Sequence, residues 1–226
     1  RLQINYIDMY LIHWPVAEKH VAAWQGIEEH ALQGTIRAIG MSNYHRHHYE
    51  EVMKVARIKP AAVQLELHPY LAQCENLEYY KKQERDTIIL IFGDHQPSLG
   101  DEYTQLFKST VTKKRLKALK KYEVPFIMWA NFEIGSEKIK QTSPNYLAPL
   151  LMQKSGLPLT AYQKYLLNLR KDIPVISGIS CISADGDAFD LGDEKYYDKL
   201  LDYRILQYNN VFDKKNLVAD KFCYKE

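Results

Sequence analysis

The chain has 226 residues, of which 46% are hydrophobic and 26% are charged. This composition is ordinary for a globular protein and argues against a disordered chain, a collagen-like repeat and a coiled coil. The formal net charge of +2 indicates no general affinity for nucleic acid, and no apolar run reaches the roughly 18 residues that a membrane span needs.

Neither the cysteines nor the local runs of charge predict a functional site. Cys74, Cys181 and Cys223 are odd in number and have no metal-like spacing, so we expect neither a disulfide framework nor a zinc site. The basic run 113–121 is interpreted as a solvated helix face. The chain begins at Arg1 without a signal peptide or membrane anchor, which favours the cytoplasm for the chain as it stands and a true N-terminus upstream.

The first third of the chain alternates strand and helix patterns. Short apolar runs of β-rich residues are typical of buried parallel strands, and apolar residues three and four positions apart are typical of helices packed on a sheet. The predicted order is strand 7–12, helix 21–31, strand 36–41, helix 49–56, strand 61–67 and helix 75–82.

Polar residues follow each of these predicted strands. His13 follows the first strand, Ser42 and Asn43 follow the second, and Gln64 lies near the end of the third, ahead of Glu66 and His68. The carboxyl ends of the strands form the active-site mouth of a βα barrel. Three successive strands that end in polar groups therefore predict a functional site.

The pattern changes after residue 84. Strand 87–92 runs directly into Gly93, Asp94 and His95, and strand 124–129 follows the basic run. Three helices are predicted further along: one opened by Ser143 and Pro144 and closed by Gly156, one beginning at Thr160, and one from about Glu194 with a single apolar face of Tyr197, Leu200, Leu201, Ile205 and Tyr208. Residues 185–187 are expected to form a solvated turn, because they fail the EF-hand spacing.

The segments 6–15, 34–44 and 63–70 together resemble the aldo/keto reductases, through Ile-His-Trp-Pro at 12–15 and Gly-Met-Ser-Asn-Tyr at 40–44. The resemblance implies that His13 is the catalytic residue that orients the substrate carbonyl, and that Ser42, Asn43 and Gln64 hold the nicotinamide carboxamide of NADPH. The family also needs a proton-donating tyrosine with lysine and aspartate partners. These belong to strands that would precede Arg1.

From about residue 86 the chain resembles the lipoteichoic-acid-synthase-like phosphoglycerol transferases of the alkaline phosphatase and sulfatase superfamily. The resemblance rests on segments 92–97, 124–131, 143–149 and 208–210. It implies that Asp94 and His95 bind a divalent metal, manganese or magnesium. The family's remaining glutamate ligand and its threonine nucleophile belong to segments expected before Asp86, and its members act outside the membrane.

We therefore expect an α/β chain with a partial (βα) barrel fragment of three units at 1–84, followed by a partial alkaline-phosphatase/sulfatase-type α/β segment at 85–226. The leading hypothesis is a catalytically incomplete fusion, whose larger part derives from a metal-dependent phosphoglycerol transferase or sulfatase-like enzyme. The alternative is a remnant of an NADPH-dependent carbonyl reductase. Neither NADPH nor the metal is expected to bind tightly.

Two further expectations concern the surface. An incomplete barrel leaves open sheet edges, so we expect self-association and the capture of strand 87–92 by the first sheet. His45, His47 and His48, with His20 and His30, match no zinc signature, and we interpret them as flanking a solvent-facing helix start.

Overall fold

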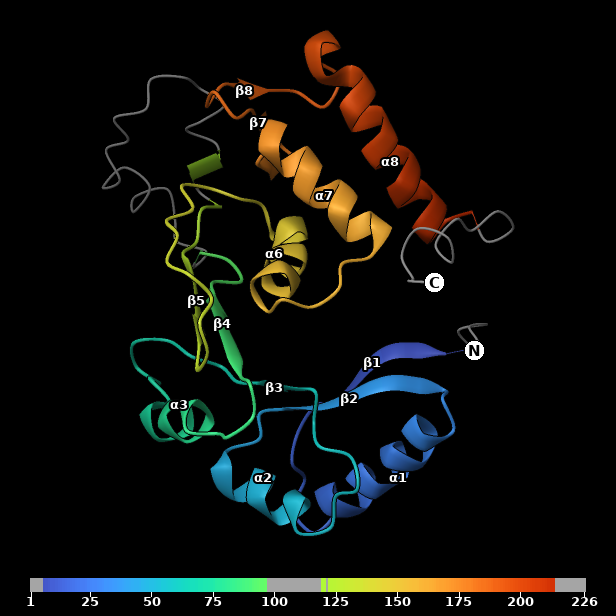
Figure 1. Ribbon diagram of the computed structural model, residues 1–226, viewed down its shortest axis with the longest axis vertical. Coiled ribbons are helices and arrows are strands. Elements are labelled where there is room, and N and C mark those ends of the chain that lie inside the picture. The colour runs from blue at the N-terminus through green and yellow to red at the C-terminus, as the bar shows by residue number, and fades with distance from the viewer. Residues whose placement is uncertain (1–5, 97–118, 121, 214–226) are drawn as a thin grey trace. The chain divides into compact units, whose positions relative to one another are not determined.

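The computed structural model describes residues 6–96, 119–120 and 122–213 (Figure 1). The chain forms two compact units, Arg1–Thr87 and Ile88–Glu226, called unit 1 and unit 2 below. Both combine helices with strands, so the protein is mixed α/β. Within the described ranges no helix has the length and apolar character needed to cross a membrane.

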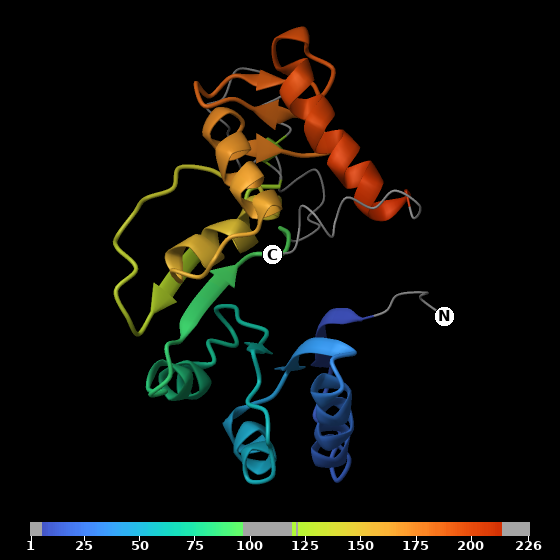
Figure 2. The ribbon, with the colours of Figure 1, turned by 45° about the vertical axis from the view of Figure 1, so that its right-hand side comes forward.

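Unit 1 is built on a parallel sheet in the order β1-β2-β3. Its strands are β1 (Ile7–Ile12), β2 (Ile36–Ser42) and β3 (Ala62–Gln64). Its helices are α1 (His20–Leu32), α2 (Arg46–Met53) and α3 (Cys74–Lys81). Helices α1 and α2 cover the same face of the sheet (Figure 2). The predicted alternation of strands and helices is confirmed here.

The core of unit 1 lies between the sheet and these two helices. Trp24 of α1 and Val52 of α2 are fully buried with Ile39 and Met41 of β2. The central strand is held close to both neighbours at Gly40, which pairs with Leu11 and Ala62. A Cβ atom at Gly40 would lie 2.5 Å from Leu11 Cδ2 and 2.6 Å from the Ala62 carbonyl oxygen, so only glycine fits without a shift.

Two details of the predicted strands are wrong. Asp8, Met9 and Tyr10 of β1 are exposed, because β1 is an edge strand and not a strand buried on both faces. Strand β3 ends at Gln64 and not at residue 67, because its partner strand ends there too: Asn43 leaves the strand conformation with a φ of 63°.

In unit 2, β4 (Ile88–Phe92) pairs with β5 (Phe126–Ala130) in a two-stranded antiparallel sheet. The expectation that strand 87–92 joins the first sheet is therefore wrong. The physical reason is that β5, an apolar strand of matching length within the same unit, provides the partner, with Leu90 opposite Met128. Pairing with it satisfies the β4 backbone groups that face this partner, along the full length of the strand.

The rest of unit 2 surrounds a second core. Its elements are η1 (Pro144–Tyr146), α6 (Leu147–Lys154), α7 (Ala161–Asp172), β6 (Val175–Ile176), β7 (Cys181–Ile182), β8 (Ala188–Phe189), η2 (Glu194–Tyr196) and α8 (Tyr197–Val211). Tyr146 and Leu200 are fully buried in this core. Helix α7 starts where predicted, with a capping box between Thr160 and Gln163. The predicted turn at 185–187 is confirmed, between β7 and β8.

Helix α8 corrects the predicted apolar face. Leu200 and Tyr203 are buried, whereas Ile205 and Tyr208 are 54% and 64% exposed. Residues three apart share a face of a helix, so the buried stripe runs through positions 200 and 203, and the other apolar residues lie outside it. The basic run 113–121 lies almost entirely outside the described residues, as does Cys223.

Candidate functional site

Unit 1 brings its polar strand-end residues to one edge of the sheet. The three strands are parallel, so their carboxyl ends lie together. His13 directly follows β1, Ser42 is the last residue of β2, and Gln64 is the last residue of β3. In the register, Ser42 lies opposite Gln64. We call His13, Ser42, Asn43 and Gln64 the strand-end cluster.

Asn43 connects all three strand ends. Its side-chain Nδ2 donates to the His13 carbonyl at 2.9 Å and to Ser42 Oγ at 3.1 Å. Its backbone N–H donates to the Gln64 carbonyl at 2.8 Å. The positive φ of 63° at Asn43 allows its side chain and its backbone N–H to make these hydrogen bonds together. Asparagine tolerates this left-handed conformation better than most residues. One residue therefore fixes the spacing of the cluster.

The cluster combines a buried hydroxyl with exposed side chains. Ser42 is 6% exposed, whereas His13 and Gln64 are exposed. The His13 ring lies 5.9 Å from the Trp14 ring, centroid to centroid, and Trp14 is itself 57% exposed. The site is thus an open rim that presents a hydroxyl, two side-chain amides, an imidazole and an indole.

Glu66 and His68 lie beyond the end of β3 and form a separate pair. His68 Nε2 is 3.2 Å from Glu66 Oε1, and both side chains are exposed. The backbone N–H of Tyr70 donates to His68 Nδ1, and Gln73 Nε2 donates to the Glu66 carbonyl. Within the described residues, no hydrogen bond or ion pair joins this pair to the strand-end cluster. Their predicted place in the same site therefore receives no support from hydrogen bonding.

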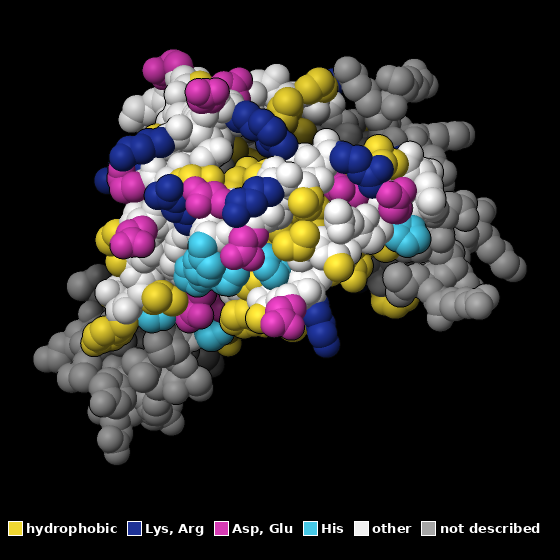
Figure 3. All heavy atoms as spheres, turned by 90° about the horizontal axis from the view of Figure 1, so that it is seen from below, with side chains coloured by type: hydrophobic (Ala, Val, Ile, Leu, Met, Phe, Trp, Pro, Cys, Tyr) yellow, Lys and Arg dark blue, Asp and Glu magenta, His cyan; other side chains and the backbone are white. Residues whose placement is uncertain are grey.

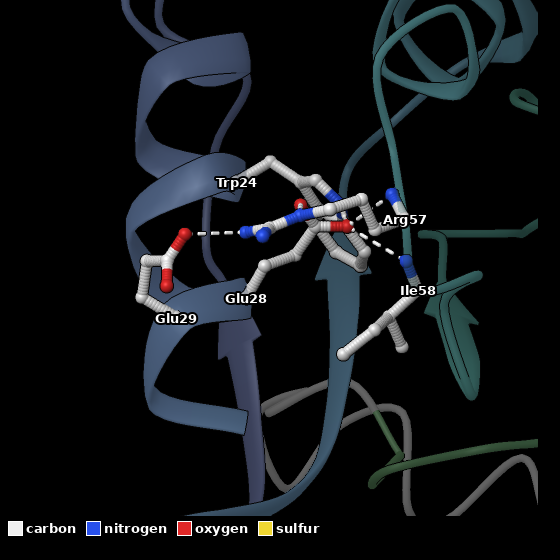
Figure 4. A network of polar contacts seen from close by, with 5 residues as sticks. All are labelled: Trp24, Glu28, Glu29, Arg57 and Ile58. Atoms are coloured by element: carbon white, nitrogen blue, oxygen red, sulfur yellow. Dashed lines mark hydrogen bonds and ion pairs between the residues drawn. The ribbon is translucent and has the colours of Figure 1, made fainter. Parts of the chain in front are cut away.

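The carboxylate of Glu28 is buried on the side of the sheet that α1 and α2 cover, and the sequence patterns did not predict it. Glu28 of α1 is fully buried and accepts hydrogen bonds at its Oε1 from Trp24 Nε1 and from the backbone N–H groups of Arg57 and Ile58 (Figure 4). The Arg57 guanidinium also lies beside the Glu28 and Glu29 carboxylates. The only sequence signal is a glutamate one turn after a tryptophan on an apolar helix face.

Asp94 and His95 follow β4 in unit 2, as predicted. Both side chains are exposed, and His95 Nε2 is 3.3 Å from Asp94 Oδ2. Asp94 Oδ1 accepts a hydrogen bond from the backbone N–H of His95, while His95 Nδ1 lies 3.0 Å from the Gln96 carbonyl oxygen. In the part of the chain that the structure describes, no three His, Cys, Asp or Glu side chains are placed to hold a metal. Two exposed ligands do not fit a divalent ion on their own, and the metal role stays a prediction.

Two family models match the chain. The aldo/keto reductase family model matches residues 1–92, and the sulfatase model matches residues 77–157. The first match contains the whole strand-end cluster, and the second contains Asp94 and His95. No family model for a phosphoglycerol transferase is among these matches.

Curated relatives match the first part of the chain. The glyoxal reductase of Bacillus subtilis is 49% identical over 83 residues, which are 37% of this chain and 30% of that protein. The methylglyoxal reductase DkgA of Escherichia coli is 40% identical over 75 residues, which are 32% of this chain and 27% of that protein. The chain thus spans about 30% of the length of these relatives.

Solved structures match the same part. An aldo/keto reductase from Brucella melitensis is 32% identical, with a TM-score of 0.33, and the match covers 35% of this chain and 32% of that one. The apo form of Gox0644 is 34% identical, with a TM-score of 0.34 and coverage of 36% and 31%. Nothing in the described residues or in these matches indicates nucleic-acid binding. Residues 1–92 are thus similar to the aldo/keto reductases and residues 77–157 to the sulfatases, and the two matches overlap at residues 77–92.

Proposed function

We propose that the chain is a catalytically incomplete fusion, in which residues 1–84 are a barrel fragment of an NADPH-dependent aldo/keto reductase and residues 85–226 derive from a sulfatase-like phosphoglycerol transferase. The observation that carries the first half is the joining of three strand ends by Asn43. This arrangement supports binding of the nicotinamide end of NADPH and not turnover.

The chemistry of the strand-end cluster fits a carboxamide. A carboxamide has one carbonyl acceptor and one NH₂ donor, and a side-chain amide presents the complementary pair. The Gln64 side chain is exposed, and the side-chain hydrogen bonds of Asn43 to His13 and Ser42 use only its Nδ2, which leaves Oδ1 as an acceptor. The Ser42 hydroxyl accepts from Asn43 and keeps its own hydrogen for donation.

His13 is the proposed carbonyl-orienting residue. When bound, NADPH supplies a hydride to the carbonyl carbon, and the resulting alkoxide needs a proton. A histidine beside the carbonyl can donate a hydrogen bond to its oxygen. Among the described residues, however, no hydrogen bond joins the His13 ring to a tyrosine or a lysine that could supply the proton. We therefore expect weak NADPH binding and no measurable reduction by this chain alone.

For the second half, Asp94 and His95 are the proposed metal ligands, with manganese or magnesium as the metal. An Asp-His pair directly after a strand and a glycine is the supporting pattern. With no third ligand among the described residues, we derive no catalytic step through a metal.

The test is a binding titration with reduced nicotinamide mononucleotide, which carries the carboxamide but no adenosine. We expect weak, saturable binding by the wild-type chain and several-fold weaker binding by Gln64→Ala. Gln33→Ala, which removes an exposed glutamine at the end of α1, is the matched control and should bind like the wild type. Equal affinity in all three chains, or no binding at all, would contradict the proposed site.

A further inference from the structure

A buried aromatic and histidine cluster joins α1 to α2 behind the strand-end cluster. His20 is the first residue of α1, Tyr44 lies in the turn after β2, and His48 lies on α2. The ring centroids are 5.6 Å apart for His20 and Tyr44, 5.7 Å for His20 and His48, and 6.0 Å for Tyr44 and His48. We call these three residues the histidine lock. His20 is 5% exposed and Tyr44 is fully buried, which corrects the interpretation of His20 as solvent-facing.

The lock contains polar atoms without partners. His20 Nε2 lies 2.9 Å from the Glu51 carboxylate on α2, so this nitrogen carries the proton and its Nδ1 is left as an acceptor. That Nδ1, His48 Nδ1 and Tyr44 Oη are all buried with no hydrogen-bond partner among the described residues. A proton added to either Nδ1 would be a buried donor without an acceptor, which costs free energy.

Other titratable groups surround the lock, and those that act on His48 are three histidines and one carboxylate, Glu51. The His48 ring lies 3.8 Å from that of His47 and 6.0 Å from that of His45, centroid to centroid. Histidine side chains gather on the face seen in Figure 3. The charged and titratable groups on the elements around the lock come from three segments. They are His45 from the turn after β2, Arg46, His47, Glu50 and Glu51 from α2, and Glu75, Tyr79 and Tyr80 from α3.

These surroundings oppose protonation of His48. Burial, followed by repulsion from His47, His20 and His45, lowers the pKa of His48, and Glu51 only partly offsets this. Burial raises the pKa of Tyr44 to about 12, so the phenol stays neutral and cannot act as a counter-ion. Arg46 is engaged with Glu50, which removes one of the nearby carboxylates.

We propose that the histidine lock is a pH-sensitive latch that holds the α1–α2 edge and the Asn43 turn in place at neutral pH and releases them in mild acid. This device is independent of whether NADPH binds. The sign follows from linkage: a histidine whose pKa is lower in the folded state stabilises the fold above the unfolded pKa, and that stability is lost as the pH falls through the folded pKa.

The histidine lock is connected to the strand-end cluster through the backbone. Tyr44 directly follows Asn43, and its carbonyl accepts a hydrogen bond from Tyr80 of α3. His45 Nδ1 lies 2.8 Å from Asn76 Nδ2, and Asn76 Oδ1 accepts from the backbone N–H of Arg46. Release of the lock should therefore loosen the segment that carries both Asn43 and the start of α2.

The test is hydrogen–deuterium exchange of the full chain at about pH 7.5 and about pH 5.5. Histidines titrate between these two pH values, whereas ordinary carboxylates do not. The rates are corrected for the pH dependence of intrinsic amide exchange. In the wild type, protection of peptides covering residues 44–55 should fall by roughly threefold or more, while α7 changes little. In His48→Gln the fall should be much smaller. His30→Gln, which removes an exposed histidine on α1, should behave like the wild type.

Two results would overturn the proposal: protection of residues 44–55 that does not depend on pH, or the same pH dependence in His48→Gln as in the wild type. If His48→Gln does not fold, the wild-type chain still decides the question by NMR. The imidazole resonances of His48 should then titrate below the ordinary histidine value of about 6.5, in the pH range in which protection of residues 44–55 is lost. A His48 titration at or above that ordinary value would equally refute the latch.

Discussion

Replacement of Glu28 by alanine should strongly destabilise unit 1. Glu28 is fully buried, and its carboxylate is the shared acceptor for the Trp24 indole and for the backbone N–H groups of Arg57 and Ile58, at 3.0, 2.8 and 2.8 Å. Alanine removes the acceptor and leaves these donors buried between α1 and the loop after α2.

The magnitude follows from those contacts. A hydrogen bond to a charged group contributes about 1.5–3 kcal/mol, and each buried donor left without a partner costs about 1–3 kcal/mol. These terms are not additive, and breaking a buried charged network costs about 3–5 kcal/mol in total, which we take as the prediction. A single domain has a stability of about 5–15 kcal/mol, so the variant should be near the limit of folding.

The assay is urea denaturation of the full chain, followed by exchange of α1 and α2 peptides so that unit 1 is measured separately. Glu29→Ala is the matched control, because Glu29 is the next residue, contacts the same Arg57 and is exposed. It should have a much smaller effect, since solvent screens that ion pair. A Glu28→Ala chain with the stability of Glu29→Ala would refute the role assigned to the buried carboxylate.

Four further predictions follow from the same structure. With glyoxal as substrate, NADPH oxidation should stay at background and be unchanged in His13→Ala; a rate that depends on His13 would contradict the incomplete site. Gly40→Ala should destabilise unit 1 by about 1–3 kcal/mol in the same urea assay, because its methyl group would overlap the Ala62 carbonyl and its neighbours; an unchanged transition would show that the strands can separate. Calorimetric titration with manganese should give only weak binding, lost in the double variant Asp94→Ala and His95→Ala, and micromolar affinity would mean that further ligands exist. Light scattering after size-exclusion chromatography should reveal self-association of the chain through its open sheet edges, whereas a monodisperse monomer with one sharp melting transition would exclude it.

The strand-end cluster could be predicted because its signals are local. Each strand is a short apolar run, and the polar residue that follows it is adjacent in the sequence, as with His13 after β1 and Ser42 at the end of β2. Parallel pairing then brings these residues together without further information. What the pattern could not predict is the connecting role of Asn43, which depends on a positive φ and on a carbonyl 30 residues away.

The features that sequence reasoning missed all depend on long-range contacts. In the sequence, Glu28 looks like an ordinary helix residue, because the backbone N–H that donates to its carboxylate belongs to Ile58, 30 residues later. His20 reads as a polar residue before a helix, but its partner Glu51 lies 31 residues away. The predicted partner of β4 was wrong for the same reason, since an apolar strand does not by itself specify the strand with which it will pair.

The central claim is that one polypeptide joins the two regions near residues 82–86, and mass spectrometry of the source cells tests it most directly. Chymotrypsin cleaves after large hydrophobic residues, so the peptide from Lys81 to Leu90, released after Tyr80 and Leu90, would cross the junction. We predict that this peptide is detected together with peptides from both sides of it. Detection of peptides from the two sides without any that crosses the junction would contradict the fusion and show that the two regions belong to separate proteins.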